Sequence, residues 1–241
     1  MKEGAGPPEF DAFAENYDDA LAKGLEISGE KKDFFAEGRI RFLTELFEEL
    51  QFKPQRVLDF GCGTGSSVPF LLKLPGVESI LGVDVSRKSI EVAKTEHGCR
   101  LVEFRTLEAF RAKNEFDLVF CNGVFHHIPV AERSGSVNLI RDALRPEGLF
   151  ALWENNPWNP GTRYVMSRIE FDRDAVTLSV PEAKRLIGES GMKVTNSSSW
   201  FYFPRFLRWL RWMEPWLSPL PLGAQYLVLA RKGLVSVPVD D

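Results

Sequence analysis

The stretch VLDFGCGTG, residues 57–65, decides the fold of this chain. It begins as a short apolar strand, reaches an acid at Asp59, and then carries glycines at positions 61, 63 and 65 before a segment of helical character. A strand, a glycine loop and a helix in this order bring a ligand close to the backbone at the carboxyl end of the strand. Dinucleotide-binding folds use a similar turn, so the loop alone predicts a nucleotide-type site without naming its ligand.

Short apolar runs alternate with helical patterns on both sides of this stretch. Strands are predicted at residues 56–60, 79–85, 101–104, 116–122, 148–154, 193–200 and 224–231. Helices are predicted at residues 13–27, 34–50, 66–74, 87–96, 131–144 and 181–190. The strands are continuous apolar runs, which is typical of a sheet covered by helices on both faces. The pattern predicts an α/β fold with a doubly wound parallel sheet.

Two segments interrupt this alternation, residues 155–176 and residues 200–222. Both follow strands in the second half, and insertions after the carboxyl ends of strands usually build the binding crevice. We therefore expect them to shape the substrate site. In the absence of a repeat or a long linker, we expect a single domain over residues 1–241, with a helical cap at 1–50, a cofactor-binding half at 51–153 and a substrate-shaping half at 154–241.

The composition is that of an ordinary globular protein, with a net charge of −4 and 44% hydrophobic residues. No basic face is evident, which argues against a nucleic-acid partner. The three cysteines, Cys62, Cys99 and Cys121, form no C-x-x-C pair, which indicates a reducing compartment and no disulfide framework. With no signal peptide and no long apolar run, we expect a cytoplasmic protein.

Two acids at predicted strand tips specify the ligand further. Asp59 would repel a pyrophosphate, but it suits a ligand that carries ammonium and sulfonium charge. Asp84 ends the next strand and can accept both hydroxyls of a ribose. A nucleoside with a cationic tail and no phosphate satisfies both acids, and S-adenosylmethionine is such a ligand.

The chain resembles the class I S-adenosylmethionine-dependent methyltransferases over about residues 10–232. The motifs VLDFGCGTG, LGVDVS, FDLVFCNGVFHHIP and ALRPEGLFALWE carry the resemblance, in the order and spacing of that family. It implies a Rossmann-like methyltransferase fold with a mostly parallel seven-stranded sheet whose last strand is antiparallel. It also implies an N-terminal helical cap, insertions after strands 5 and 6, and S-adenosylmethionine as the cofactor.

The resemblance also implies which residues contact the cofactor. Thr106 and Leu107 stand where the family usually has an acid near the adenine, and the acid is displaced to Glu108. A backbone N–H from Leu107 could replace that contact. The implied cofactor-binding residues are Tyr17, Asp59, Gly61, Cys62, Gly63, Asp84, Val85, Thr106, Leu107 and Asn122.

Candidate catalytic residues follow the fourth and fifth strands: His126, His127 and Glu154. A histidine is suited to deprotonating a phenol or similar hydroxyl at neutral pH. Two interpretations stay open: one histidine packs against the cofactor loop and bonds to backbone, or one acts as a general base, for which His127 is the better candidate. Glu154 is a candidate substrate ligand or base. We expect no metal site, because adjacent histidines point in different directions.

Residues 200–222 contain four of the six tryptophans, interleaved with Arg205, Arg208 and Arg211. Three interpretations stay open: a peripheral membrane contact, an aromatic lid over an apolar substrate, or a helix packed on the sheet with extended arginines.

These features together predict a methyltransferase for a small or lipid-like apolar acceptor, with oxygen as the favoured atom. A non-catalytic S-adenosylmethionine-binding sensor or partner protein is the alternative. An aminopropyl transferase would need several acids around a polyamine, and the sequence does not supply them.

Overall fold

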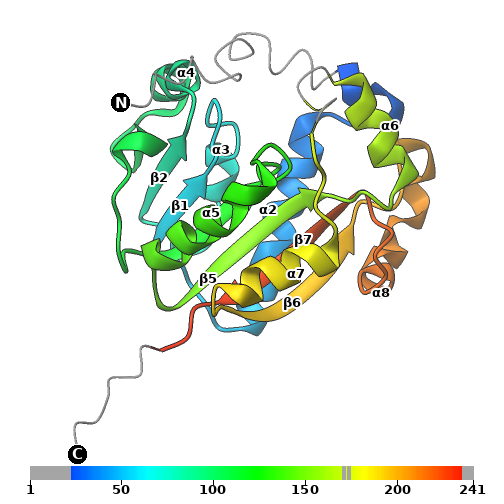
Figure 1. Cartoon of the computed structure of the whole chain (residues 1–241). Helices are drawn as coiled ribbons and strands as arrows, with labels where there is room; N and C mark the ends of the chain where they lie inside the picture. The colour runs from blue at the N-terminus through cyan, green and yellow to red at the C-terminus, as the bar shows by residue number, and fades with distance from the viewer. Residues whose placement is uncertain (1–22, 170–171, 173–174, 235–241) are drawn as a thin grey trace, which may run out of the picture.

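The computed structural model describes residues 23–169, 172 and 175–234. These residues form one seven-stranded sheet in the order β3-β2-β1-β4-β5-β7-β6, with helices on both faces (Figure 1). The strands are β1 (Arg56–Phe60), β2 (Ser79–Asp84), β3 (Val102–Thr106), β4 (Phe116–Asn122), β5 (Leu144–Asn155), β6 (Lys193–Trp200) and β7 (Gln225–Arg231). The predicted doubly wound sheet is therefore confirmed.

The helices alternate with these strands, as the sequence pattern predicts. The α-helices are α2 (Lys32–Glu49), α3 (Val68–Leu71), α4 (Arg87–His97), α5 (Val130–Ala143), α6 (Pro160–Arg168), α7 (Val180–Glu189) and α8 (Glu214–Leu217). The 3-10 helices are η2 (Glu26–Ser28), η3 (Leu107–Ala109) and η5 (Arg205–Met213). Most of the predicted helix at 13–27, including Tyr17, lies outside the described residues.

Strands β1 to β5 pair in parallel, so their carboxyl ends meet at one edge of the sheet. Strand β7 runs antiparallel to both β5 and β6, which confirms the orientation predicted for the last strand. The register places Asp59 beside Gly82 of β2 and Phe120 of β4, and Asn122 beside Trp153. Residues from distant parts of the sequence thus meet where a parallel sheet binds its ligands.

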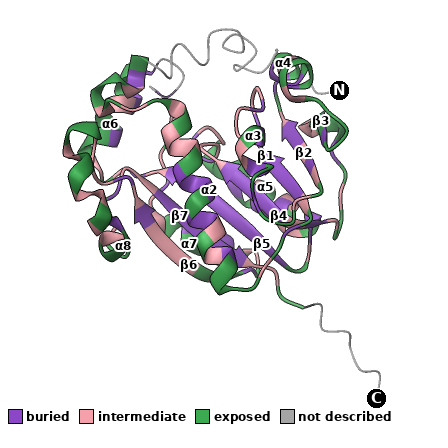
Figure 2. Ribbon diagram, turned by 180° about the vertical axis from the view of Figure 1, so that it is seen from behind, coloured by how far each residue is buried: buried purple, intermediate pink, exposed green. Residues whose placement is uncertain are grey.

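Two apolar layers enclose the sheet. Helices α2, α3 and α4 contribute to the core on one face, and α5 and α7 contribute to the core on the other. Figure 2 shows the central strands β1, β4, β5 and β7 mostly buried between these layers, whereas β6 at the edge is mostly of intermediate exposure. Continuous burial explains why the central strands are apolar runs, whereas the edge strands β3 and β6 contain polar residues.

Several predicted elements differ in detail from the structure; the strand predicted at 148–154, for example, extends over Leu144–Asn155 as β5. The helix predicted at 66–74 is α-helical only over Val68–Leu71, and 3-10-type bonds from Lys73 to Phe70 and from Leu74 to Leu71 complete the turn. The following Pro75 and Gly76 prevent a longer helix.

A further difference is in residues 200–222, where helical spacing gives η5 and the short α8 instead of one α-helix. Prolines at 204, 215, 219 and 221 limit regular α-helix in this segment. Together with α6 it lies at one end of the molecule (Figure 1). The insertions after β5 and β6 are thus present as predicted. No helix among the described residues is long and apolar enough to cross a bilayer.

Candidate active site

The loop after β1 requires glycine because its backbone angles are positive and, at Gly61, because a neighbouring side chain leaves no space for a Cβ. Gly61, Gly63 and Gly65 have φ angles of +74°, +53° and +82°, a region that side chains disfavour. A Cβ at Gly61 would lie 2.4 Å from a methyl carbon of Val124, whereas one at Gly63 would meet nothing within 4 Å. The loop is held by the N–H groups of Gly61 and Cys62, which both donate to the carbonyl of Val83. Gly63 thus leaves bare backbone open to a ligand.

A cavity of about 370 Å³ lies over this loop. Of the predicted cofactor residues, Gly61, Gly63, Asp84, Val85, Leu107 and Asn122 line it. Three of the predicted residues are not among its lining: Asp59, Cys62 and Thr106. The Glu108 carboxylate pairs with the Arg87 guanidinium at 2.8 Å. We call this space the cofactor cleft.

Asp84 is held in place at the end of β2. Its Oδ2 accepts the N–H of Gly63 and its Oδ1 accepts the N–H of Ser86, both at 2.9 Å. Each carboxylate oxygen can accept a further hydrogen bond. The side chain is thus fixed in the cleft with accepting capacity for a pair of hydroxyls.

Asp59 is a buried acid at the end of β1, with 2% of its surface exposed. Within the described chain its Oδ2 has no hydrogen-bond partner. Burial, reinforced by the charge of Asp84 and opposed by that of Arg39, raises the pKa of Asp59 to about 7. A cationic ligand nearby would favour the ionised form of Asp59. A carboxylate at this position therefore suits a cofactor that carries an ammonium group.

A second cavity, also of about 370 Å³, lies beside the cofactor cleft. Aromatic side chains dominate one wall, and Arg39, Asn155 and Gln225 form a polar group within it. The Arg39 guanidinium donates to Gln225 Oε1 at 2.9 Å, and the Gln225 amide donates to Asn155 Oδ1 at 3.3 Å. We call this space the acceptor cavity. It shares Asn122, Gly123 and His127 with the cofactor cleft.

His126 is the centre of a buried charged network. Its Nδ1 lies 2.6 Å from Glu154 Oε2, and its Nε2 lies 3.3 Å from Asp172 Oδ1. Burial alone would lower the pKa of His126, but the two carboxylates raise it to about 10. His126 is therefore an imidazolium that joins β5 to the segment after α6, and it bonds to carboxylates rather than to the backbone.

Glu154 is committed to this network. Its Oε1 accepts the N–H groups of Val124 and Phe125 at 2.9 and 2.7 Å, and 1% of its surface is exposed. Burial opposes its ionisation, but the bonds from His126 and Phe125 outweigh burial and hold its pKa below the usual value. Glu154 lines neither cavity, and its contacts support the loop after β4. Its role as a substrate ligand or base stays a prediction.

His127 lies where the two cavities adjoin, unlike His126, which lines only the acceptor cavity, and Glu154, which lines neither. It lines both cavities, and its Nε2 lies 3.1 Å from Asp172 Oδ1. The two histidine rings are 4.0 Å apart, so the buried imidazolium also packs against His127. One carboxylate thus contacts both histidines.

Asp172 was not among the predicted site residues. It is 6% exposed, and the interactions with both histidines overcome its burial and hold its pKa low. Its only signal in the sequence is an acid within EFDRD, in the segment expected to shape the substrate site. No local pattern could show that this acid would reach two histidines more than forty positions earlier.

The three groups His126, His127 and Asp172 offer ligand atoms within 4.8 Å of one another. These atoms already face each other at hydrogen-bonding distances, which accounts for their arrangement without an ion. The absence of a metal site stays a prediction.

Comparisons with known proteins connect this fold with methyltransferases. Residues 57–148 match the model of a methyltransferase domain. A chain from the complex between the Haloferax volcanii Trm112 methyltransferase activator and a methyltransferase shares the fold, with a TM-score of 0.65 and 16% identity over 95% of this chain and 100% of that one.

Curated relatives match shorter parts. A malonyl-[acyl-carrier protein] O-methyltransferase of Legionella pneumophila is 38% identical over 34% of this chain and 32% of its own length. A polyamine aminopropyltransferase of Shouchella clausii is 28% identical over 57% of this chain and 54% of its own length. The chain thus spans about half of one relative and a third of the other.

Residues 57–148 thus match a methyltransferase domain, and the chain shares its fold with a solved methyltransferase complex, which together imply S-adenosylmethionine as the cofactor.

Proposed function

We propose that this protein methylates a hydroxyl group of a small or lipid-like apolar acceptor, with His127 as the general base. The observation that carries the proposal is the position of His127, which lines both cavities where they adjoin. A group in that position can contact an acceptor atom beside the cofactor.

The cofactor, when bound, supplies an activated methyl group. The chain then has to align the acceptor and remove its proton. His127 accepts the hydroxyl proton, and Asp172, 3.1 Å from its Nε2, stabilises the charge that His127 gains. His126 and Glu154 are positioning residues, because they fix Asp172 and the loop after β4.

The acceptor class follows from the walls of the acceptor cavity. Phe34, Phe35, Phe201, Phe203 and Phe206 supply an apolar, aromatic lining. The polar group of Arg39, Asn155 and Gln225 offers donors and acceptors for a head group. An amphiphile with a hydroxyl-bearing head and an apolar body suits this combination.

Aminopropyl transfer, the activity named for one relative, is disfavoured by charge. The lining of the acceptor cavity includes three cationic side chains that disfavour a polyamine: Lys32, Arg39 and the His126 imidazolium. Its two acids are engaged, since Glu30 pairs with Arg211 and Asp172 pairs with the histidines.

The setting of the protein is part of the proposal. We propose peripheral membrane contact through residues 200–222, where exposed tryptophans accompany arginines. The free thiols of Cys62, Cys99 and Cys121 suit the reducing cytoplasm. Nucleic acid is not among the proposed partners, because the chain carries a net charge of −4.

The test is transfer of a labelled methyl group from S-adenosylmethionine to fractions of a lipid and metabolite extract. We expect label in an apolar, hydroxyl-containing fraction, and a loss of about 10²- to 10⁴-fold in rate for His127→Gln. His97→Gln is the matched control, because His97 lies outside both cavities. Affinity for S-adenosylhomocysteine should stay near the wild-type value in both variants.

Two outcomes would contradict the proposal. Wild-type protein that binds S-adenosylhomocysteine but labels no fraction would favour the non-catalytic sensor. An undiminished rate in His127→Gln would remove the general base.

A further inference from the structure

Large apolar side chains are exposed together at one end of the molecule. Between positions 206 and 222, Phe206, Trp209, Trp212 and Trp216 are 75%, 68%, 63% and 71% exposed. Leu220 and Leu222 are exposed beside them in the sequence. We call these six residues the aromatic face. Single exposed apolar residues are common, but a group of this size marks an interaction surface.

The backbone beneath the aromatic face is fixed. The buried carboxylate of Glu214 accepts the N–H groups of Phe201, Tyr202 and Phe203. The Tyr202 hydroxyl donates to the carbonyl of Leu217 at 2.6 Å. These bonds tie η5 and α8 to the end of β6, so the aromatic side chains are held outward by a built support.

A second set of contacts anchors η5 to the N-terminal part of the described chain. The Arg211 guanidinium pairs with Glu30 at 2.9 Å and lies 4.3 Å above the ring of Phe34. Trp212 and Trp216 pack edge to face at 5.2 Å, yet both stay exposed. The tryptophans therefore contact each other without being covered by the rest of the described chain.

The exposed charges within residues 200–222 and on α6 are cationic. Arg208 is exposed between the aromatic residues, and Arg163 and Arg168 are exposed on α6 at the same end (Figure 1). The single acid of residues 200–222, Glu214, is buried and bound to backbone. Tryptophan with arginine, and no exposed acid within the segment, is the composition of surfaces that lie in the head-group region of a bilayer.

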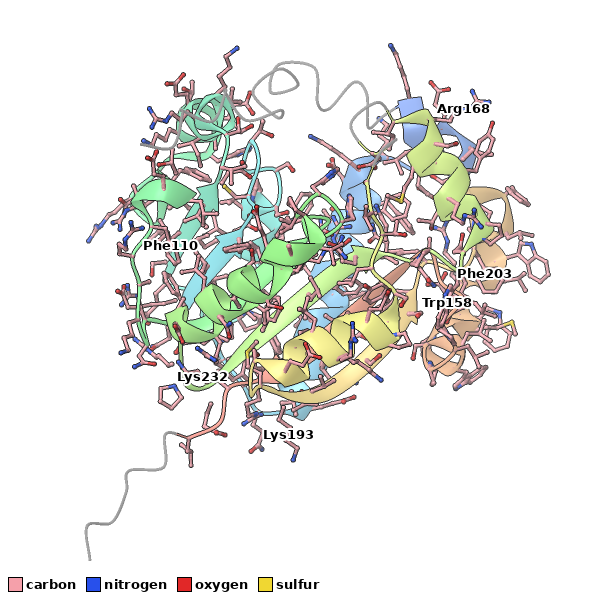
Figure 3. All side chains as sticks on the ribbon, viewed as in Figure 1. Phe110, Trp158, Arg168, Lys193, Phe203 and Lys232 are labelled. Carbon is pink, nitrogen blue, oxygen red and sulfur yellow. The ribbon has the colours of Figure 1, made fainter. Side chains whose placement is uncertain are left out.

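The aromatic face also adjoins the acceptor cavity. Phe206 lines that cavity while it is 75% exposed, and Phe203, three positions earlier, lines it too. Trp158, Arg168 and Phe203 lie toward this side of the molecule, opposite Phe110 (Figure 3). A hydrogen bond of 2.7 Å from the Asn159 amide to the Leu222 carbonyl joins the loop that carries Trp158 to the aromatic face. The same surface is thus continuous with the cavity.

We propose that the aromatic face docks on the surface of an anionic lipid bilayer, so that an amphiphilic acceptor enters the acceptor cavity from the membrane. The aromatic side chains would enter the head-group region, and the arginines would contact lipid phosphates. The docking part of this proposal depends only on the exposed residues of the aromatic face and the nearby arginines. The entry of the acceptor rests on the proposed function.

The test is binding of the full chain to vesicles, without cofactor or acceptor. Vesicles of phosphatidylcholine alone are compared with vesicles that also contain phosphatidylglycerol, using co-sedimentation and the blue shift of tryptophan emission. The double variant Trp209→Ser/Trp212→Ser tests the aromatic contribution, and Arg208→Gln tests the charge. Leu50→Ser/Leu101→Ser is the matched control, because both leucines are exposed elsewhere on the chain.

We expect wild type and the control to pellet with the anionic vesicles and less with the neutral ones. The double tryptophan variant should lose at least about tenfold in partition coefficient, and Arg208→Gln should lose a few-fold on anionic vesicles only. A wild type that stays in the supernatant would overturn the inference. So would equal pelleting of the tryptophan variant, or a lipid-independent dimer that the same substitutions abolish.

Failure of this inference is distinguishable from failure of the proposed function. If docking is absent, methyl transfer to a detergent-dispersed acceptor would still proceed, and only the membrane route would be lost. If docking is present and no fraction is labelled, the proposed function fails instead.

Discussion

The cofactor cleft and the acceptor cavity have similar volumes but are built in different ways. The cleft depends on backbone at the ends of adjacent parallel strands, with Gly63 open to the space and Asp84 fixed by two N–H groups. The acceptor cavity depends on side chains from η2, α2, α6, the segment after β6 and β7. A backbone site tolerates few changes of residue type, whereas a side-chain site can be altered one wall at a time.

The two regions also treat charge differently. Outside the lining of the cleft, Asp59 is a buried acid whose Oδ2 has no hydrogen-bond partner within the described chain, and its pKa is raised to about 7. Beside the acceptor cavity, Glu154 and Asp172 are fully committed to the histidines. The protonation of Asp59 can therefore change when a ligand binds, whereas the ion pairs of Glu154 and Asp172 hold the histidines in a fixed geometry.

The largest expected effect comes from the fixed arrangement. His126→Gln would leave two buried carboxylates short of a counter-charge, so we expect a loss of about 3–5 kcal/mol in the free energy of unfolding. His97→Gln, at the half-buried end of α4, should cost under about 1 kcal/mol. Denaturant titration followed by circular dichroism measures both, and equal stability of the two variants would contradict the network.

The same variant has a pH signature. The pKa of His126 is raised to about 10 in the folded state, so its stabilisation is fully present below its ordinary value of 6.5 and is lost as pH rises toward 10. Wild type should therefore lose stability over that window, and His126→Gln should lack this part of the slope. A slope that is unchanged in the variant would assign the effect to another group.

A smaller effect is expected from the backbone of the cleft. Gly61→Ala forces a side chain into a positive φ angle, at a cost of about 1–2 kcal/mol, and pushes Val124 into the space of the ligand. We expect affinity for S-adenosylhomocysteine to fall at least about tenfold by calorimetry. Gly135→Ala in α5, where a Cβ meets nothing within 4 Å, is the control and should bind like wild type.

The sequence predicts these two regions unequally, for a physical reason. The cleft follows from local patterns, since Asp59, the glycines and Asp84 each stand at the end of a recognisable strand. The strands at 116–122 and 193–200 have the predicted bounds, because apolar runs and turn residues define them. The role of Asp172 depends on contacts between distant segments, which no local pattern encodes. Likewise, the hydrogen bonds of Glu154 to the loop after β4 join residues about thirty positions apart, which no local pattern encodes.

A further expected effect concerns the pH dependence of ligand affinity. The pKa of Asp59 is raised to about 7, so an ammonium-bearing ligand must displace a proton at lower pH. Affinity for S-adenosylhomocysteine should rise with pH, by up to about tenfold per unit below pH 7, and then level off. Asp59→Asn should flatten this profile. A flat profile in wild type would mean that Asp59 does not sense the ligand.

The most direct test of the whole account is calorimetric titration of S-adenosylhomocysteine into wild type, Asp84→Asn and the control Glu91→Gln. Asp84 lines the cleft, whereas Glu91 is exposed on α4 outside it. The account predicts one site per chain in wild type and in Glu91→Gln, with at least about tenfold weaker binding in Asp84→Asn. No binding to wild type, or equal affinity in all three proteins, would contradict it.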